Sequence, residues 1–122
     1  MRFETAPGEQ AQVDWGSLAY VGAGGKKRRV WVFVMTMGWS RTCYVELARK
    51  AYTAAFIQCN VNAFEYLGGV PRRCLYDNAK VITLGRDGAK RPVWNQRMLD
   101  FALRVGFELR LCQPYRAQTK GK

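Results

Sequence analysis

The run VWVFVMTM at residues 30–37 decides the fold of this chain. It is almost entirely apolar and is rich in β-branched and aromatic side chains, which favour extended backbone. Such an unbroken run is typical of a strand that is covered on both faces. We therefore expect residues 30–37 to form a strand at the centre of the hydrophobic core.

Two further strands are expected on either side of this run. In residues 11–20, Ala11, Val13 and Trp15 share one face of a strand, while Gln12 and Asp14 share the other. Residues 42–48 also alternate and predict a third strand, which is a candidate edge strand. Between the first two strands, residues 22–29 combine a glycine-rich turn with four consecutive cations, which predicts a flexible, positively charged hairpin tip.

The spacing of apolar residues becomes helical after residue 52. The first expected helix ends at Gly68 and Gly69, and its buried face carries Phe56, Cys59, Ala63 and Leu67. A second helix follows the N-cap Asn95 and ends at Gly106, with Met98, Phe101, Ala102 and Val105 buried. Short strands are expected at residues 73–77 and 107–112, one after each helix.

This order of elements predicts an α/β fold. Three strands that form an antiparallel meander are followed by two helical crossovers to further strands. The order matches the ribonuclease H-like fold, a five-stranded mixed sheet flanked by helices. The length of 122 residues allows one domain, residues 1–122, and not two.

Composition restricts the partner and the chemistry. Lys and Arg outnumber Asp and Glu by 20 to 9, a net charge of +11 that favours a polyanion such as nucleic acid. There is no histidine, so a catalytic site would have to depend on carboxylates or on a metal ion. The four cysteines show no paired spacing, which indicates reduced core thiols in a cytoplasmic protein rather than a zinc site or disulfides. We expect no membrane span and no signal peptide.

Two aspartates occupy unusual positions. Asp14 interrupts the apolar residues of the first expected strand, and Asp77 ends a later strand and is followed by Asn78. An unpaired charge is costly in a strand interior, which makes both aspartates candidate catalytic residues. The alternative is structural, because an Asp-Asn pair at a strand end often caps a turn.

Three blocks of sequence together resemble insertion-sequence transposases of the IstA type, which belong to the retroviral-integrase-like superfamily. The blocks are QVDWG at residues 12–16, GGVPRR at 68–73 leading into YDN at 76–78, and PYRAQTKGK at 114–122. The resemblance implies that Asp14 and Asp77 are the first two ligands of an Asp-Asp-Glu triad that holds two Mg²⁺ or Mn²⁺ ions. It also implies that the glutamate follows Lys122, so we expect a core that is truncated before its third carboxylate and is weak or inactive alone. Asp87, Asp100 and Glu108 are possible stand-ins for this third carboxylate, but we assign the role to none of them.

The resemblance implies cleavage of transposon-end DNA by water and transfer of the freed 3′ hydroxyl into target DNA. It further implies a homo-oligomer and a helper ATPase. The candidate phosphate contacts are cations, each of which has a solvated surface role as its alternative: Lys26, Lys27, Arg28, Arg29, Lys80, Arg116, Lys120 and Lys122. Two other functions stay open, a nuclease or resolvase on the same fold and a nucleic-acid-binding module without chemistry. Core packing is the expected role of Trp15 and Trp31, although tryptophans can also stack on bases.

Overall fold

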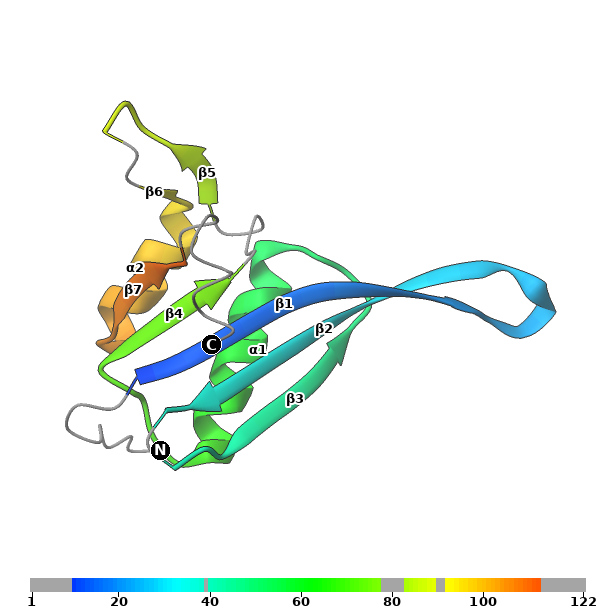
Figure 1. Cartoon of the computed structure of the whole chain (residues 1–122), viewed down its shortest axis with the longest axis horizontal. Coiled ribbons are helices and arrows are strands. Elements are labelled where there is room, and N and C mark those ends of the chain that lie inside the picture. Colours follow the sequence, from blue (N-terminus) through cyan, green and yellow to red (C-terminus); the bar gives the residue numbers. More distant parts are fainter. Residues whose placement is uncertain (1–9, 39, 78–82, 90–91, 113–122) are drawn as a thin grey trace, which may run out of the picture.

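The computed structural model describes residues 10–38, 40–77, 83–89 and 92–112. Five strands form one mixed sheet in the order β3-β2-β1-β4-β7 (Figure 1). β1 pairs antiparallel with β2, and β2 pairs antiparallel with β3; β4 pairs parallel with β1, and β7 pairs parallel with β4. Their bounds are Gln10–Val21 (β1), Lys27–Met37 (β2), Cys43–Ala48 (β3), Arg73–Asp77 (β4) and Glu108–Leu111 (β7).

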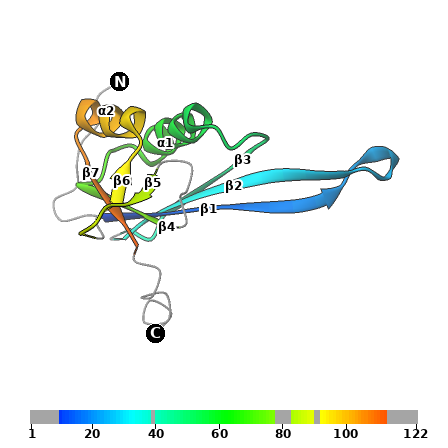
Figure 2. The ribbon, with the colours of Figure 1, turned by 90° about the horizontal axis from the view of Figure 1, so that it is seen from above.

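Both described helices cover the same face of the sheet, as the view from above shows (Figure 2). The helices are α1 (Thr53–Leu67), between β3 and β4, and α2 (Gln96–Val105), between β4 and β7. The opposite face of the sheet is covered by no described helix, and we call it the open face. The expected order of strands and helices, the antiparallel meander and the edge position of β3 are all confirmed. Within the described residues, neither helix has the length and hydropathy needed to cross a membrane.

The two helices end and begin as the sequence predicts. Gly68 and Gly106 adopt positive φ angles of 79° and 97° directly after α1 and α2, a conformation that costs glycine little. The side chain of Asn95 accepts a hydrogen bond of 2.8 Å from the backbone N–H of Arg97 and so caps the start of α2. These signals fix where each crossover helix stops, and therefore where the next strand enters the sheet.

Phe56 of α1 lies at the centre of the core. Its ring contacts those of Trp15, Phe33 and Tyr76, with centroids 5.0, 5.6 and 5.6 Å apart. These residues come from α1, β1, β2 and β4, so one buried side chain joins the helix to the three central strands. The predicted packing role of Trp15 is confirmed, since it is 6% exposed; Trp31 is partly buried and stacks on it.

Three expectations about the fold need correction, and one element was not expected. Val30, Val32 and Val34 lie on the open face and are only partly buried, so residues 30–37 are covered fully on one face and not on both. Residues 27–29 belong to β2 rather than to the turn, which consists of the short helix η1 (Ala23–Gly25) and its neighbours. Cys43 is exposed, unlike the buried Cys59 and Cys74. A hairpin of β5 (Thr83–Arg86) and β6 (Pro92–Trp94) precedes α2 and was not predicted.

Candidate active site

Asp14 and Asp77 lie side by side in the sheet. β1 and β4 are parallel neighbours, and their register pairs Val13 with Tyr76 and Asp14 with Asp77. Neighbouring strands are about 4.8 Å apart, so the backbones of the two aspartates are separated by a single strand spacing. The fold thus brings together two carboxylates that are far apart in the sequence.

The two side chains also point to the same face. Ala11, Val13, Cys74 and Tyr76 are buried under the helices, and alternation along each strand therefore directs Asp14 and Asp77 to the open face. Asp14 is exposed and Asp77 is half-buried. The expectation that Asp14 sits where a charge is costly is wrong, because its side of the strand faces solvent. What distinguishes it is its carboxylate neighbour.

The end of β4, which carries Asp77, is held by a buried polar contact. The hydroxyl of Tyr76 donates a hydrogen bond of 2.8 Å to Oδ1 of Asn60, and Nδ2 of Asn60 donates one of 2.8 Å to the carbonyl of Phe56. Both side chains are 0% exposed, and burial raises the pKa of Tyr76 well above its usual value. The hydroxyl therefore stays protonated, and α1 fixes the strand residue that directly precedes Asp77.

A pair of carboxylates is a suitable ligand set for a hard divalent cation such as Mg²⁺ or Mn²⁺. Within the described residues, however, no third Asp, Glu, Cys or His joins the pair to form a larger cluster. Among the described residues, two carboxylates are therefore available as candidate metal ligands at this point of the sheet.

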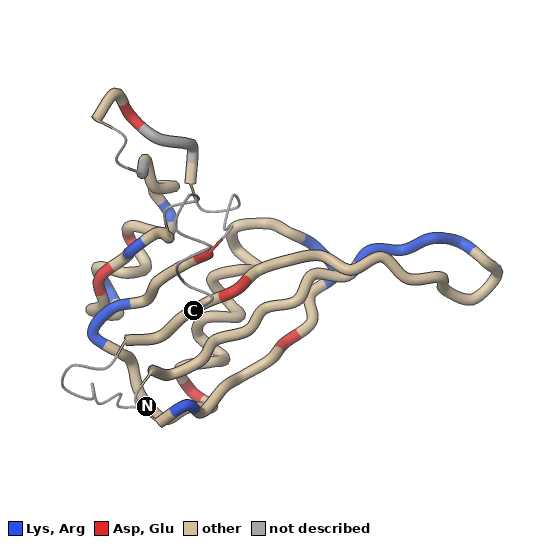
Figure 3. The backbone as a smooth tube through the Cα atoms, viewed as in Figure 1, with Lys and Arg blue, Asp and Glu red and all other residues tan. Residues whose placement is uncertain are grey.

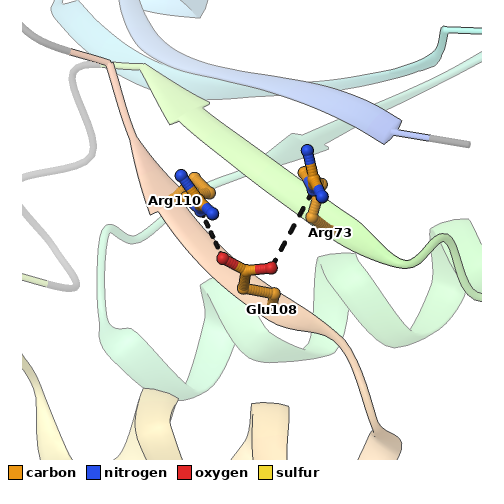
Figure 4. Close-up of polar contacts among 3 residues, drawn as sticks. All are labelled: Arg73, Glu108 and Arg110. Atoms are coloured by element: carbon orange, nitrogen blue, oxygen red, sulfur yellow. Dashed lines mark hydrogen bonds and ion pairs between the residues drawn. The ribbon is translucent and has the colours of Figure 1, made fainter. Parts of the chain in front are cut away.

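Glu108, one of the stand-ins, lies on the open face, but its carboxylate interacts with two arginines and not with the aspartate pair. Its carboxylate contacts Arg110 on β7 and forms an ion pair of 3.9 Å with Arg73 on β4 (Figure 4). Arg73 is the register partner of Glu108 and precedes Asp77 by four residues, which places Glu108 about 13 Å from Asp77 along the strand. It is too distant to share an ion with the pair.

The other two stand-ins lie outside the five-stranded sheet. Asp87 is an exposed turn residue whose Oδ1 accepts a hydrogen bond of 2.9 Å from the backbone of Ala89. Asp100 is on α2 and accepts a hydrogen bond of 3.0 Å from Gln96. Neither residue has a position in the sheet next to Asp14 or Asp77.

Glu46 forms a separate polar cluster under α1. Its Oε1 accepts hydrogen bonds of 2.7 Å from the hydroxyl of Tyr44 and 3.0 Å from Nδ2 of Asn62. Burial, and then the hydrogen bond to Glu46, raises the pKa of Tyr44 to about 12. Because this cluster ties β3 to α1 on the helix-covered face, we assign it a structural role.

The predicted phosphate contacts fall into two groups. Lys26, Lys27, Arg28 and Arg29 are exposed at the far end of the β1–β2 hairpin, where Lys and Arg gather in Figure 3. Lys80, Arg116, Lys120 and Lys122 lie outside the described residues. The structure thus places four of the eight predicted cations on one projecting element and brings none of these four next to the aspartate pair.

Known proteins resemble this chain over nearly its whole length. The integrase core domain family matches residues 4–117. The chain is 45% identical over 122 residues to a protein of Geobacillus stearothermophilus assigned as the transposase for insertion sequence element IS5376. It is 39% identical to the transposase for IS640 of Shigella sonnei and 38% identical to that for IS21 of Pseudomonas aeruginosa. All of the chain is aligned in each case, but it spans only 30%, 38% and 31% of these relatives.

Solved structures support the fold independently. The catalytic core domain of HTLV-2 integrase, determined in complex with magnesium, superposes with TM-scores of 0.59 in its dimeric form and 0.57 in its trimeric form. Each superposition covers 90% of this chain and 64% of the integrase chain, at 17% and 15% identity. Such low identity supports the shared ribonuclease H-like fold alone.

Proposed function

The chain belongs to the integrase core domain family, and from this premise we propose that it is the catalytic core of a DNA transposase. The observation that carries the proposal is the parallel register of β1 and β4, which pairs Asp14 with Asp77. These aspartates are the two that the transposase resemblance selects, and the register puts them on neighbouring strands. A structural role for either carboxylate alone would not require this arrangement.

In this proposal the Asp14 and Asp77 carboxylates hold Mg²⁺ or Mn²⁺. In phosphoryl transfer, a pair of divalent ions activates the attacking oxygen and neutralises charge on the phosphate and the leaving oxygen. Asp14 and Asp77 supply ligand oxygens on the open face, and Tyr76 and Asn60 fix the strand that carries Asp77. A third ligand is required from outside the described residues.

The proposed reaction has two steps at one site. Water attacks the phosphodiester at the transposon end, a P–O bond breaks, and a free 3′ hydroxyl results. That hydroxyl then attacks a phosphodiester of the target, forms a new P–O bond and releases a target 3′ hydroxyl. The open face suits this role, because no described helix lies over the aspartate pair and a DNA strand can approach it (Figure 2).

The partners are also proposals. The net charge of +11 supports DNA as the polyanion, bound through the candidate phosphate contacts Lys26 to Arg29, Lys80, Arg116, Lys120 and Lys122. By the same resemblance we propose a bacterial, cytoplasmic protein that acts as a homo-oligomer with a helper ATPase.

The test compares three single substitutions that remove the same charge. We expect Asp14→Asn and Asp77→Asn to abolish Mn²⁺ binding in calorimetry, and Asp100→Asn, on α2, to retain it. In strand-transfer assays of the full-length transposase, the first two variants should lose both cleavage and joining. Metal-dependent cleavage without joined products would instead favour a nuclease, and unchanged Mn²⁺ binding in all three variants would favour a binding module without chemistry.

A further inference from the structure

The β1–β2 hairpin extends well beyond the rest of the sheet. β4 pairs with β1 only as far as Asp14, and β3 pairs with β2 only as far as Trp31, the partner of Ser17. Beyond the Ser17–Trp31 pair, β1 and β2 continue as an isolated two-stranded ribbon, which projects from the body in both views (Figures 1 and 2). We call residues 17–31 the basic arm. A two-stranded ribbon buries little apolar surface of its own, so its length suggests a role in contacting a partner.

The charge of the basic arm has one sign. Lys26, Lys27, Arg28 and Arg29 lie in it, and residues 17–31 contain no Asp or Glu. All four cations are exposed. Within the part of the chain that the structure describes, none of them forms an ion pair with a carboxylate, in contrast to Arg73 and Arg110. The arm therefore presents positive charge that is not neutralised within the described fold.

Three of these cations lie around an open hollow together with a residue that follows β3. The hollow is lined by Tyr20, Lys27, Arg28, Arg29 and Arg49. Arg49 directly follows β3, so it reaches the hollow from a different strand. Nη1 of Arg29 donates a hydrogen bond of 2.8 Å to Oγ of Ser17, which orients that guanidinium. The lining thus combines four cations and a phenol and includes no carboxylate.

We propose that this hollow binds the phosphate backbone of duplex DNA at a second point, away from the aspartate pair, and that Tyr20 and Arg49 belong to this contact. The proposal rests on the proposed function for the identity of the polyanion. Cations spread over a ribbon and an adjoining strand match the repeated charges of a nucleic-acid backbone, which lie about 1.7 Å apart along the duplex axis.

The position of the hollow predicts where it meets the DNA. Tyr20 follows Asp14 by six residues on the same strand, a distance of about 20 Å. One strand of duplex DNA advances about 3.4 Å per nucleotide, so 20 Å corresponds to about six base pairs. The arm would hold the backbone about six base pairs from the phosphate that lies at the carboxylates.

The test is the salt dependence of DNA binding by the purified chain. We compare Arg28→Gln/Arg49→Gln with Arg97→Gln/Arg104→Gln, a control that removes the same charge from exposed positions on α2. Labelled duplex binding is followed by fluorescence anisotropy over a series of salt concentrations. The loss of two phosphate contacts should reduce the log-log salt slope of the first variant by about 1.8, from about 0.9 per contact, while the control stays close to wild type.

Two outcomes would overturn this proposal. In one, the arm variant keeps the wild-type slope; in the other, the α2 control loses as much slope as the arm variant. Thermal melting of both variants ensures that each is folded. Calorimetry with Mn²⁺ on the same proteins separates the two proposals, because the arm variant should still bind the ion. An unchanged slope together with Mn²⁺ binding that depends on Asp14 and Asp77 would refute the arm contact and leave the proposed function intact.

Discussion

Removing the hydroxyl of Tyr76 should destabilise the chain without altering its fold. The phenol and its acceptor, Asn60, are both 0% exposed, and water cannot replace the 2.8 Å hydrogen bond between them. Tyr76→Phe leaves Oδ1 of Asn60 buried without this donor. An unsatisfied buried polar group costs about 1–3 kcal/mol, a large share of the 5–15 kcal/mol typical of a folded domain.

Urea unfolding followed by tryptophan fluorescence measures this cost. For a domain of this size the urea m-value is about 1–3 kcal/mol/M, so the midpoint should fall by about 1 M while the slope stays constant. Tyr66→Phe is the matched control, because Tyr66 is 67% exposed, and its effect should stay within about 0.5 kcal/mol.

A double-mutant cycle tests the cause. Asn60→Leu removes the acceptor, and combining it with Tyr76→Phe replaces both polar partners by apolar groups. The double variant should be more stable than the sum of the two single effects predicts, with a coupling energy of about 1–2 kcal/mol. Strict additivity, or a Tyr76→Phe effect as small as that of Tyr66→Phe, would refute the reasoning.

The remaining predictions concern pH and the helix ends. Burial raises the pKa of both Cys59 and Cys74 from 9.0 to about 12. Between these pH values the unfolded chain releases thiol protons that the folded chain keeps, so the stabilising contribution of the two thiols is complete below pH 9 and is lost as pH rises toward 12. The unfolding free energy should therefore be lower at pH 11 than at pH 8, and a Cys59→Ala/Cys74→Ala variant should show a flatter profile; an equally steep profile would contradict this. Asn95→Ala should cost about 1 kcal/mol in urea unfolding, because it removes the N-cap of α2, and no loss would argue against the cap. Gly68→Ala should lower the melting temperature at a cost of about 1 kcal/mol, because the φ angle of Gly68 is +79°. Gly16→Ala is the control and should be neutral, because an added Cβ there meets nothing within 4 Å. Equal effects of the two substitutions would exclude backbone strain as the cause.

The elements with strong local signals could be predicted from the sequence. The alternation around Val13 gives β1, the N-cap Asn95 and the stop at Gly106 delimit α2, and the glycines after residue 21 give the turn of the hairpin. Each of these signals acts over a few residues of contiguous chain. The β5–β6 hairpin was missed because its strands have only four and three residues, too few to show a period.

Features that depend on contacts between distant segments could not be predicted in the same way. Local patterns identify Asp14 and Asp77 as unusual, but only the parallel register of β1 and β4 makes them neighbours. The exposed side of residues 30–37 follows from both described helices packing on one face, which no local pattern reveals. Likewise, Arg49 gives no signal in the sequence, and its place beside the basic arm depends on the pairing of β3 with β2.

The most direct test of the metal-binding proposal is anomalous diffraction from crystals of the chain soaked in Mn²⁺. The account predicts an anomalous peak on the open face of the sheet, within ligand distance of the carboxylates of both Asp14 and Asp77. An ion bound only elsewhere, for example at Glu46 or Glu108, or no bound ion at Mn²⁺ concentrations that saturate binding in solution, would contradict it.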